Sequence, residues 1–144
     1  MGERWFETPI LLRTSAFCRS QDDYERASQY MAVAQRLSEV QFKSEVWCEL
    51  GEISFAQSRA VGAVDASGEV RKAEYFLEHA ITLARAQKAI LAEARAAIVV
   101  ARVQITTDRR AQALSLISEI HRRFPPTENS ADMDDLEALL HELR

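Results

Sequence analysis

Glycine and proline are scarce, with four and three residues respectively in a chain of 144. An all-β fold needs many tight turns, and these two residues supply most of them, so the shortage disfavours a β-sandwich or a barrel. The chain also lacks an apolar run of the roughly 18 residues that a membrane-spanning helix needs. We therefore expect a helical protein with no membrane partner.

Cysteine is nearly absent as well, because Cys18 and Cys48 are the only two. A small secreted protein held together by disulfides uses more cysteines than this, and no apolar export signal stands near Met1. These two absences predict a cytoplasmic protein whose thiols are reduced.

A strong excess of one charge is lacking too, since 18 basic residues stand against 22 acidic ones and the net charge is −4. A general nucleic-acid binder needs a concentrated positive surface, so we expect no nucleic-acid partner. The charges are unevenly distributed, with an excess of bases between Arg85 and Arg123 and of acids from Thr127 onward. We expect the acidic end to match the basic segment within the molecule rather than to form a second binding site.

Alanine, the best helix former, is abundant, with 22 residues. Apolar residues recur every three or four positions through most of the chain, and this pattern predicts seven helices and no strand. Pro125 and Pro126 end the sixth helix, and Asn129 and Ser130 begin the seventh. The periodicity dissolves between residues 58 and 68, where we expect a loop.

Three of these helices share one spacing, in which an alanine is followed by an apolar residue four positions on and by Ala or Ile three further. The sets are Ala27/Met31/Ala34, Ala73/Leu77/Ala80 and Ala113/Ile117/Ile120. A small residue, Ser15, Gly51 or Ala101, stands in the helix before each set. Small residues at the contact let antiparallel helices cross closely, so the spacing predicts stacked helix pairs.

Trp47, Leu50-Gly51, Ala73 and Ala80 resemble the tetratricopeptide repeat, whose signature places a Trp, a Leu-Gly pair and two alanines within about 34 residues. This resemblance implies a single all-α domain over 1–144, built of antiparallel helix pairs in a short right-handed superhelix. The expected repeats cover about 3–41, 44–87 and 90–126, with the loop at 58–68 inserted into the second, and a capping helix covers about 130–143.

A longer similarity covers nearly the whole chain. Residues 47–53 and 73–87 and the ending 135–143 look like the C-terminal repeat arm of bacterial signalling proteins. Those proteins carry an ATPase, often fused to a class III adenylate cyclase or a helix-turn-helix transcriptional regulator. The resemblance implies a detached or remnant sensor and regulatory arm, which contacts other proteins and has no catalytic activity of its own.

Motifs for catalysis, cofactors and metals are missing, including a P-loop, a Gly-rich dinucleotide turn and His-Glu-x-x-His. The histidines His79, His121 and His141 fall on three different expected helices, whereas a metal site needs ligands at characteristic spacings. We expect no enzyme activity, no cofactor and no metal.

The first helix of each pair in such an array lines a concave surface, and its outward residues form the expected protein-binding face. That face presents Glu45, Cys48, Glu52 and Phe55 in the second pair, and Arg95, Ile98 and Arg102 in the third. Acidic residues beside basic ones could hold a peptide through charge and apolar contacts. We therefore expect a scaffold whose partner is a protein or peptide.

Two alternatives remain open for these residues. The glutamates and arginines could instead pair with each other and serve only solubility, or the groove around Arg95 and Arg102 could hold a small molecule. A separate apolar group, Trp5, Phe6 and Ile10, would face a preceding repeat in a longer array. An uncovered apolar end lowers solubility, so we expect these three residues to form the contact of a homodimer.

Overall fold

The computed structural model describes residues 7–37, 42–60, 62–63, 65–124 and 130–144. Within these ranges the protein is all-α, with no strand, as the sequence predicts. The helices are α1 (Glu7–Ser20), α2 (Tyr24–Leu37), α3 (Lys43–Arg59), α4 (Ala66–Ala86), α5 (Ile90–Thr106), α6 (Arg110–Arg123) and α7 (Ala131–Leu143). No helix in the described ranges combines the length and the apolar character that crossing a membrane requires.

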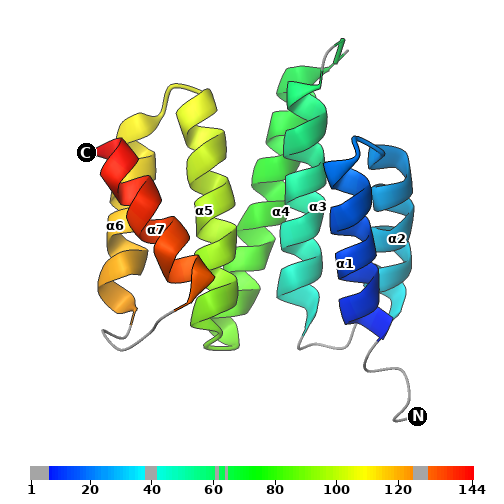
Figure 1. Ribbon diagram of the computed structural model, residues 1–144, viewed down its shortest axis with the longest axis horizontal. Helices are drawn as coiled ribbons and strands as arrows, with labels where there is room; N and C mark the ends of the chain where they lie inside the picture. Colours follow the sequence, from blue (N-terminus) through cyan, green and yellow to red (C-terminus); the bar gives the residue numbers. More distant parts are fainter. Residues whose placement is uncertain (1–6, 38–41, 61, 64, 125–129) are drawn as a thin grey trace.

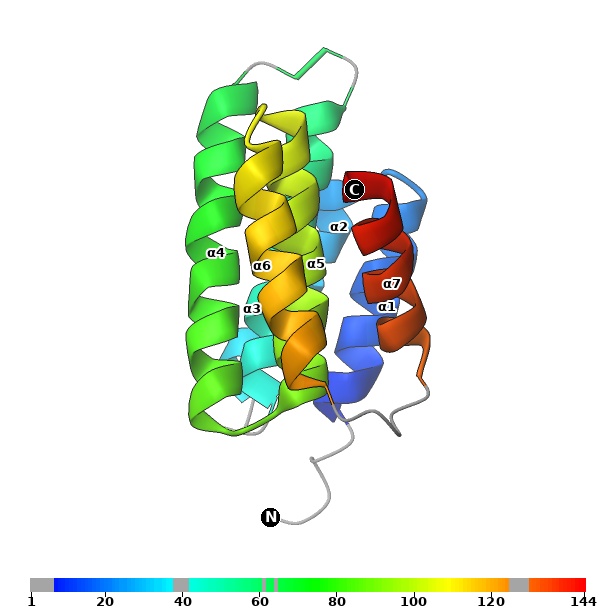
Figure 2. The ribbon, with the colours of Figure 1, turned by 90° about the vertical axis from the view of Figure 1, so that its left-hand side faces the viewer.

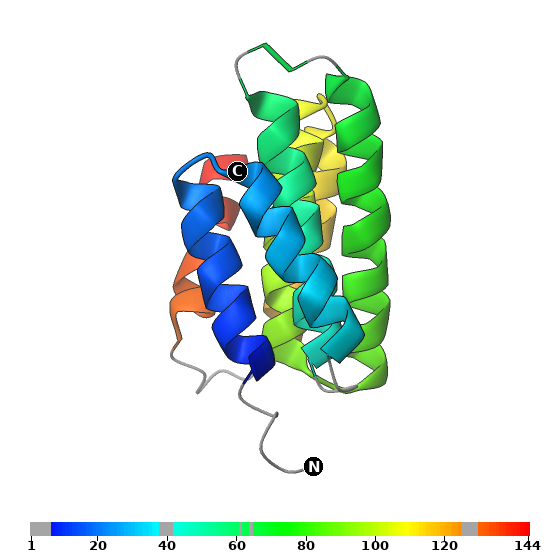
Figure 3. The same ribbon diagram turned by 90° about the vertical axis from the view of Figure 1, so that its right-hand side faces the viewer.

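Consecutive helices run in opposite directions, and α1, α3 and α5 lie side by side (Figure 1). Each of these three packs against the helix that follows it, and α7 packs on α5 and α6. Views from the two ends show that α1 and α7 project on the same side of the molecule, while α4 lies on the opposite side (Figure 2, Figure 3). The result is a concave face with α3 and α5 at its floor and α1 and α7 at its edges.

The small residues predicted to lie between helices do lie there. Ser15, Ala27, Ala73, Ala101 and Ala113 are completely buried. Gly51 is buried where α3 crosses α4, and a Cβ atom at this position would lie only 2.6 Å from Cγ of Leu77. No real Cβ contact is that short, so the observed approach of the two helices depends on glycine.

Three of the helix connections use the same turn. Asp22, Lys88 and Asp108 adopt left-handed backbone conformations, with φ of 60°, 56° and 59°, just after α1, α4 and α5. In each turn the next residue donates its N–H to a carbonyl five positions back, for example Asp23 to Cys18 at 2.9 Å. This bond satisfies a carbonyl that the end of the helix leaves without a partner.

The connection between α3 and α4 is shorter than the sequence predicts. The expected loop covers residues 58–68, whereas α3 continues to Arg59 and α4 already begins at Ala66. The carboxylate of Asp65 accepts the N–H of Gly68 at 2.9 Å, and this cap places Gly68 in the first turn of the helix. The extra residues of the second helix pair therefore lengthen its helices, and little is left for an inserted loop.

In the part of the chain that the structure describes, the buried apolar side chains form three clusters, and each cluster joins one helix pair to a neighbouring helix. The first lies among α1, α2 and α3, the second among α3, α4 and α5, and the third among α5, α6 and α7. In the third cluster Leu136, Leu139, Leu140 and Leu143 of α7 cover the end of the array. Helices α3 and α5, which form the floor of the concave face, each take part in two of these clusters.

Candidate functional site

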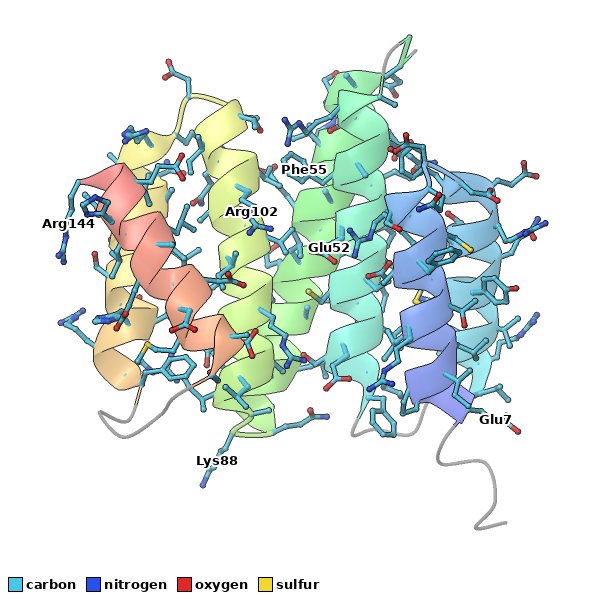
Figure 4. The ribbon with its side chains drawn as sticks, in the orientation of Figure 1. Glu7, Glu52, Phe55, Lys88, Arg102 and Arg144 are labelled. Carbon is cyan, nitrogen blue, oxygen red and sulfur yellow. The ribbon has the colours of Figure 1, made fainter. Side chains whose placement is uncertain are left out.

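The concave face contains a hollow of about 250 Å³, to which α1, α3, α5 and α7 all contribute. Six of the seven residues expected on the protein-binding face line this hollow: Glu45, Cys48, Glu52, Arg95, Ile98 and Arg102. The remaining lining residues are Leu12, Glu49, Ala92, Val99, Asp132 and Asp135. Glu52 and Arg102 both lie at the gap between α3 and α5 (Figure 4).

Phe55, the seventh expected residue, does not line the hollow. Its side chain is 8% exposed and packs in the cluster of α3, α4 and α5 with Leu77 and Val103. The guanidinium of Arg59 lies over its ring, 5.5 Å from the centroid. Phe55 therefore serves packing between α3, α4 and α5 and does not belong to the concave face.

Arg95 is engaged by α7. Its Nε atom lies 3.0 Å from Oδ1 and 3.1 Å from Oδ2 of Asp132, and the pKa of Arg95 is raised chiefly by this hydrogen bond. The expected match between the basic segment and the acidic end is therefore present at this pair. Arg102 is exposed and has no hydrogen bond or ion pair to any residue in the described ranges.

Glu49 is the lining residue whose role is least visible in the sequence. It is 6% exposed, and it accepts hydrogen bonds from Nε of Arg19 at 3.0 Å and from Oγ of Ser15 at 3.1 Å. Arg19 also donates to Glu52 at 2.7 Å. Burial raises the pKa of Glu49 to about 7, although Arg19 lowers it, and the charge of Glu52 raises it further. These contacts join α1 to α3 at the edge of the hollow.

Glu45 has no such partner. It is half-buried in the first turn of α3, and within the described ranges it makes no hydrogen bond or ion pair. Burial raises its pKa, and the charge of Arg95 only partly offsets that effect. The structure describes no direct ion pair between Glu45 or Glu52 and Arg95 or Arg102, because Glu52 is bound to Arg19 and Arg95 to Asp132, and the charges of Glu45 and Arg95 act on each other only from a longer distance.

The two cysteines are free thiols, and Cys18 is buried. Burial raises the pKa of Cys48 strongly, and the nearby carboxylates of Glu52 and Glu49 raise it further. A nucleophilic cysteine needs the opposite environment, because the thiolate is the reactive form. Among the described residues no group of His, Cys, Asp and Glu is placed to hold a metal ion.

The residues expected at a homodimer contact are only partly described. Trp5 and Phe6 lie outside the described ranges. Ile10 is 55% exposed, and Phe17, which is seven positions further along α1, is 65% exposed. A spacing of seven is close to two helical turns, so these two apolar side chains share one face of α1.

The comparisons with known proteins add nothing to this geometry. No protein-family model matches the chain, and no match was found among the curated proteins or the solved structures. The hollow and its residues are therefore the features of this chain that point to a function.

Proposed function

We propose that the chain is a non-catalytic scaffold whose concave face binds a segment of another protein. The observation that supports this best is the hollow itself, where four helices bring together the charged and apolar residues of the expected binding face. Concave surfaces of this kind are what stacked helix pairs typically use for binding.

The size and lining of the hollow favour a peptide segment over a small ligand. Its volume of about 250 Å³ is below the roughly 300–1,000 Å³ of most small-molecule sites. Charged side chains line much of it, whereas small-molecule sites are mostly apolar. A small ligand held near Arg95 and Arg102 is the second candidate. Among the described residues, Arg102 would be its free cation because Arg95 is bound to Asp132.

The class of scaffold that we propose is a tetratricopeptide-like array. The buried glycine at the crossing of α3 and α4 and the pairing of consecutive helices support it. The wider role, a detached or remnant arm of a bacterial signalling protein that acts in the cytoplasm, is proposed from sequence resemblance alone.

A steric block tests whether the hollow is the binding surface. Ala92 lines it and is only half-buried, so Ala92→Trp should fill the hollow without changing any charge or the core. The matched control is Leu91→Trp, because Leu91 is the next residue, is exposed and does not line the hollow. Partners would first be captured with the purified wild-type protein. The affinity of each partner for the wild type, Ala92→Trp and Leu91→Trp would then be measured.

We expect Ala92→Trp to lower the affinity for a true partner about tenfold or more, and a tenfold loss corresponds to about 1.4 kcal/mol of binding free energy. Leu91→Trp should leave the affinity unchanged. Equal affinities for all three proteins would show that binding occurs elsewhere. If the wild type instead binds a metabolite tightly and Ala92→Trp abolishes that binding, the small-ligand candidate is favoured.

Self-association through α1 is a separate part of the proposal, supported by the exposed Ile10 and Phe17. Sedimentation velocity of the wild type should show a concentration-dependent dimer, and Ile10→Glu should shift it to the monomer by placing a charge in the apolar contact. A wild-type protein that remains monomeric at high concentration would contradict this part.

A further inference from the structure

The charges around the hollow are not balanced. Its lining residues include five carboxylates and two arginines, Arg95 and Arg102. Arg19 adds a third guanidinium through its bonds to Glu49 and Glu52, and Arg95 is taken by Asp132. Within the described ranges Glu45 and Asp135 make no hydrogen bond or ion pair to a base, and Arg95 acts on Glu45 only through its charge while it is bound to Asp132. Of the described arginines at the hollow, Arg102 alone is unbound.

Glu45 differs from the other inward-lying glutamates of the chain. Glu49 is bound by Arg19, and Glu93, which is 1% exposed, is bound by both Arg85 and Arg123. Both have guanidinium partners because a carboxylate withdrawn from water is costly without one. Glu45 is half-buried at the hollow and lacks that partner.

The surroundings of Glu45 suit a long cationic side chain. Leu12, Ile98 and Val99 provide apolar surface in the same hollow, and Asp135 is exposed at its α7 edge. Lysine and arginine combine an apolar stem with a charged end, so the stem can pack on the apolar lining while the charge reaches a carboxylate. An acidic or neutral side chain would leave Glu45 unpaired and would meet a net negative surface.

We infer that the hollow receives a lysine or arginine side chain from a basic segment of the partner, with the Glu45 carboxylate as its counter-ion. This inference rests on the proposed function, and it names the chemistry of the segment that the concave face binds.

Three short fluorescein-labelled peptides of equal length test it. The three peptides have the same apolar residues. Their remaining variable positions are all lysine in the first peptide, all glutamate in the second and all glutamine in the third. Fluorescence anisotropy would measure their affinities for the wild type, Glu45→Gln and Ala92→Trp at low and at physiological salt. Glu25→Gln is the matched control, because Glu25 is exposed on α2 and its loss changes the net charge equally. Circular dichroism would confirm that each variant is folded.

The lysine peptide should bind with the highest affinity. Glu45→Gln should lower that affinity about tenfold, because the loss of one charged hydrogen bond has about this effect. Glu25→Gln should weaken it less than twofold. If the glutamate or glutamine peptide binds as well as the lysine peptide and Ala92→Trp blocks it, the inference is wrong and the proposed function stands.

Two further outcomes also contradict the inference. Equal effects of Glu45→Gln and Glu25→Gln would mean that the lysine peptide responds only to overall charge. If no peptide binds, or if Ala92→Trp leaves all binding unchanged, the concave face is not the binding surface, and the proposed function is wrong together with the inference.

Discussion

Two buried glutamates join neighbouring helix pairs in the two halves of the chain, and they differ in the number of arginines that serve them. Glu49 links α3 to α1 through Arg19, which it shares with Glu52. Glu93 of α5 accepts hydrogen bonds from Arg85 of α4 at 2.7 Å and from Arg123 of α6 at 2.6 Å. One carboxylate therefore has less than one full cation, and the other has two.

This difference sets the protonation of the two carboxyls. Burial raises the pKa of both, but at Glu93 the hydrogen bonds of Arg123 and Arg85 outweigh burial, and its pKa is lowered. At Glu49 the bonds from Arg19 do not outweigh burial, and its pKa is raised to about 7. The opposite shifts have two causes: the Glu93 carboxyl has more positive charge beside it, and burial opposes its charged form less than it does at Glu49.

Removing both arginines of Glu93 should have the largest effect. In Arg85→Met/Arg123→Met the apolar stems remain while Glu93 stays buried without a cation. Breaking a fully buried pair costs about 3–5 kcal/mol, and because Arg85 and Arg123 are themselves nearly half exposed we expect a loss of unfolding free energy at or below the lower end of that range. Urea denaturation at pH 8 would measure it, and the loss should shrink at pH 5, where Glu93 without its arginines takes up a proton.

The control for this variant is Arg13→Met/Arg36→Met, which removes two exposed arginines from α1 and α2. Its unfolding free energy should change by less than about 0.5 kcal/mol. Equal losses in the two double variants would show that the arginines of Glu93 contribute no more than surface charge.

A smaller effect, with the opposite dependence on pH, is expected for Glu49→Gln. The folded-state pKa of Glu49 is raised, so the stability that its carboxyl contributes is fully present below its unfolded pKa and is lost as the pH rises through about 7. The unfolding free energy of the wild type minus that of Glu49→Gln should therefore fall by about 1–3 kcal/mol between pH 5 and pH 8. Denaturation series at several pH values would measure this difference.

Glu93→Gln sharpens the comparison. The folded-state pKa of Glu93 is lowered, so its contribution is present above its unfolded pKa and is lost only as the pH falls through the folded value. The difference between the wild type and Glu93→Gln should stay constant between pH 5 and pH 8 and should decrease in more acidic solution. Parallel curves for the two glutamine variants would contradict the contrast between the sites.

Much of the fold could be predicted from local spacing. The recurrence of apolar residues and the small residues at Ser15, Gly51 and Ala101 predict which helix faces are buried, and those faces are buried. The left-handed turn at Lys88 could not be predicted, because lysine has no intrinsic preference for that conformation and the turn is fixed by the helices on either side. The length of α4 was missed because Asp65 caps a helix that continues through Gly68.

The site was predictable along each helix but not between helices. Glu45, Cys48 and Glu52 are spaced by three and four residues, so one face of α3 holds them all, and Glu49 on that same face could have been included. Arg95 and Asp132 are 37 positions apart, and only the packing of α7 on α5 brings them together. The expectation that acidic and basic segments match was general, whereas the particular partner depends on tertiary structure.

The close approach at Gly51 links the volumes of two positions in different helices. Leu77 occupies the space that any side chain at position 51 would need. A chain of this architecture that carries alanine or serine at position 51 should therefore carry a shorter residue than leucine at position 77, or hold α3 and α4 further apart. Exchange of bulk between these two positions is a constraint by which relatives of this chain can be judged where their overall sequences have diverged.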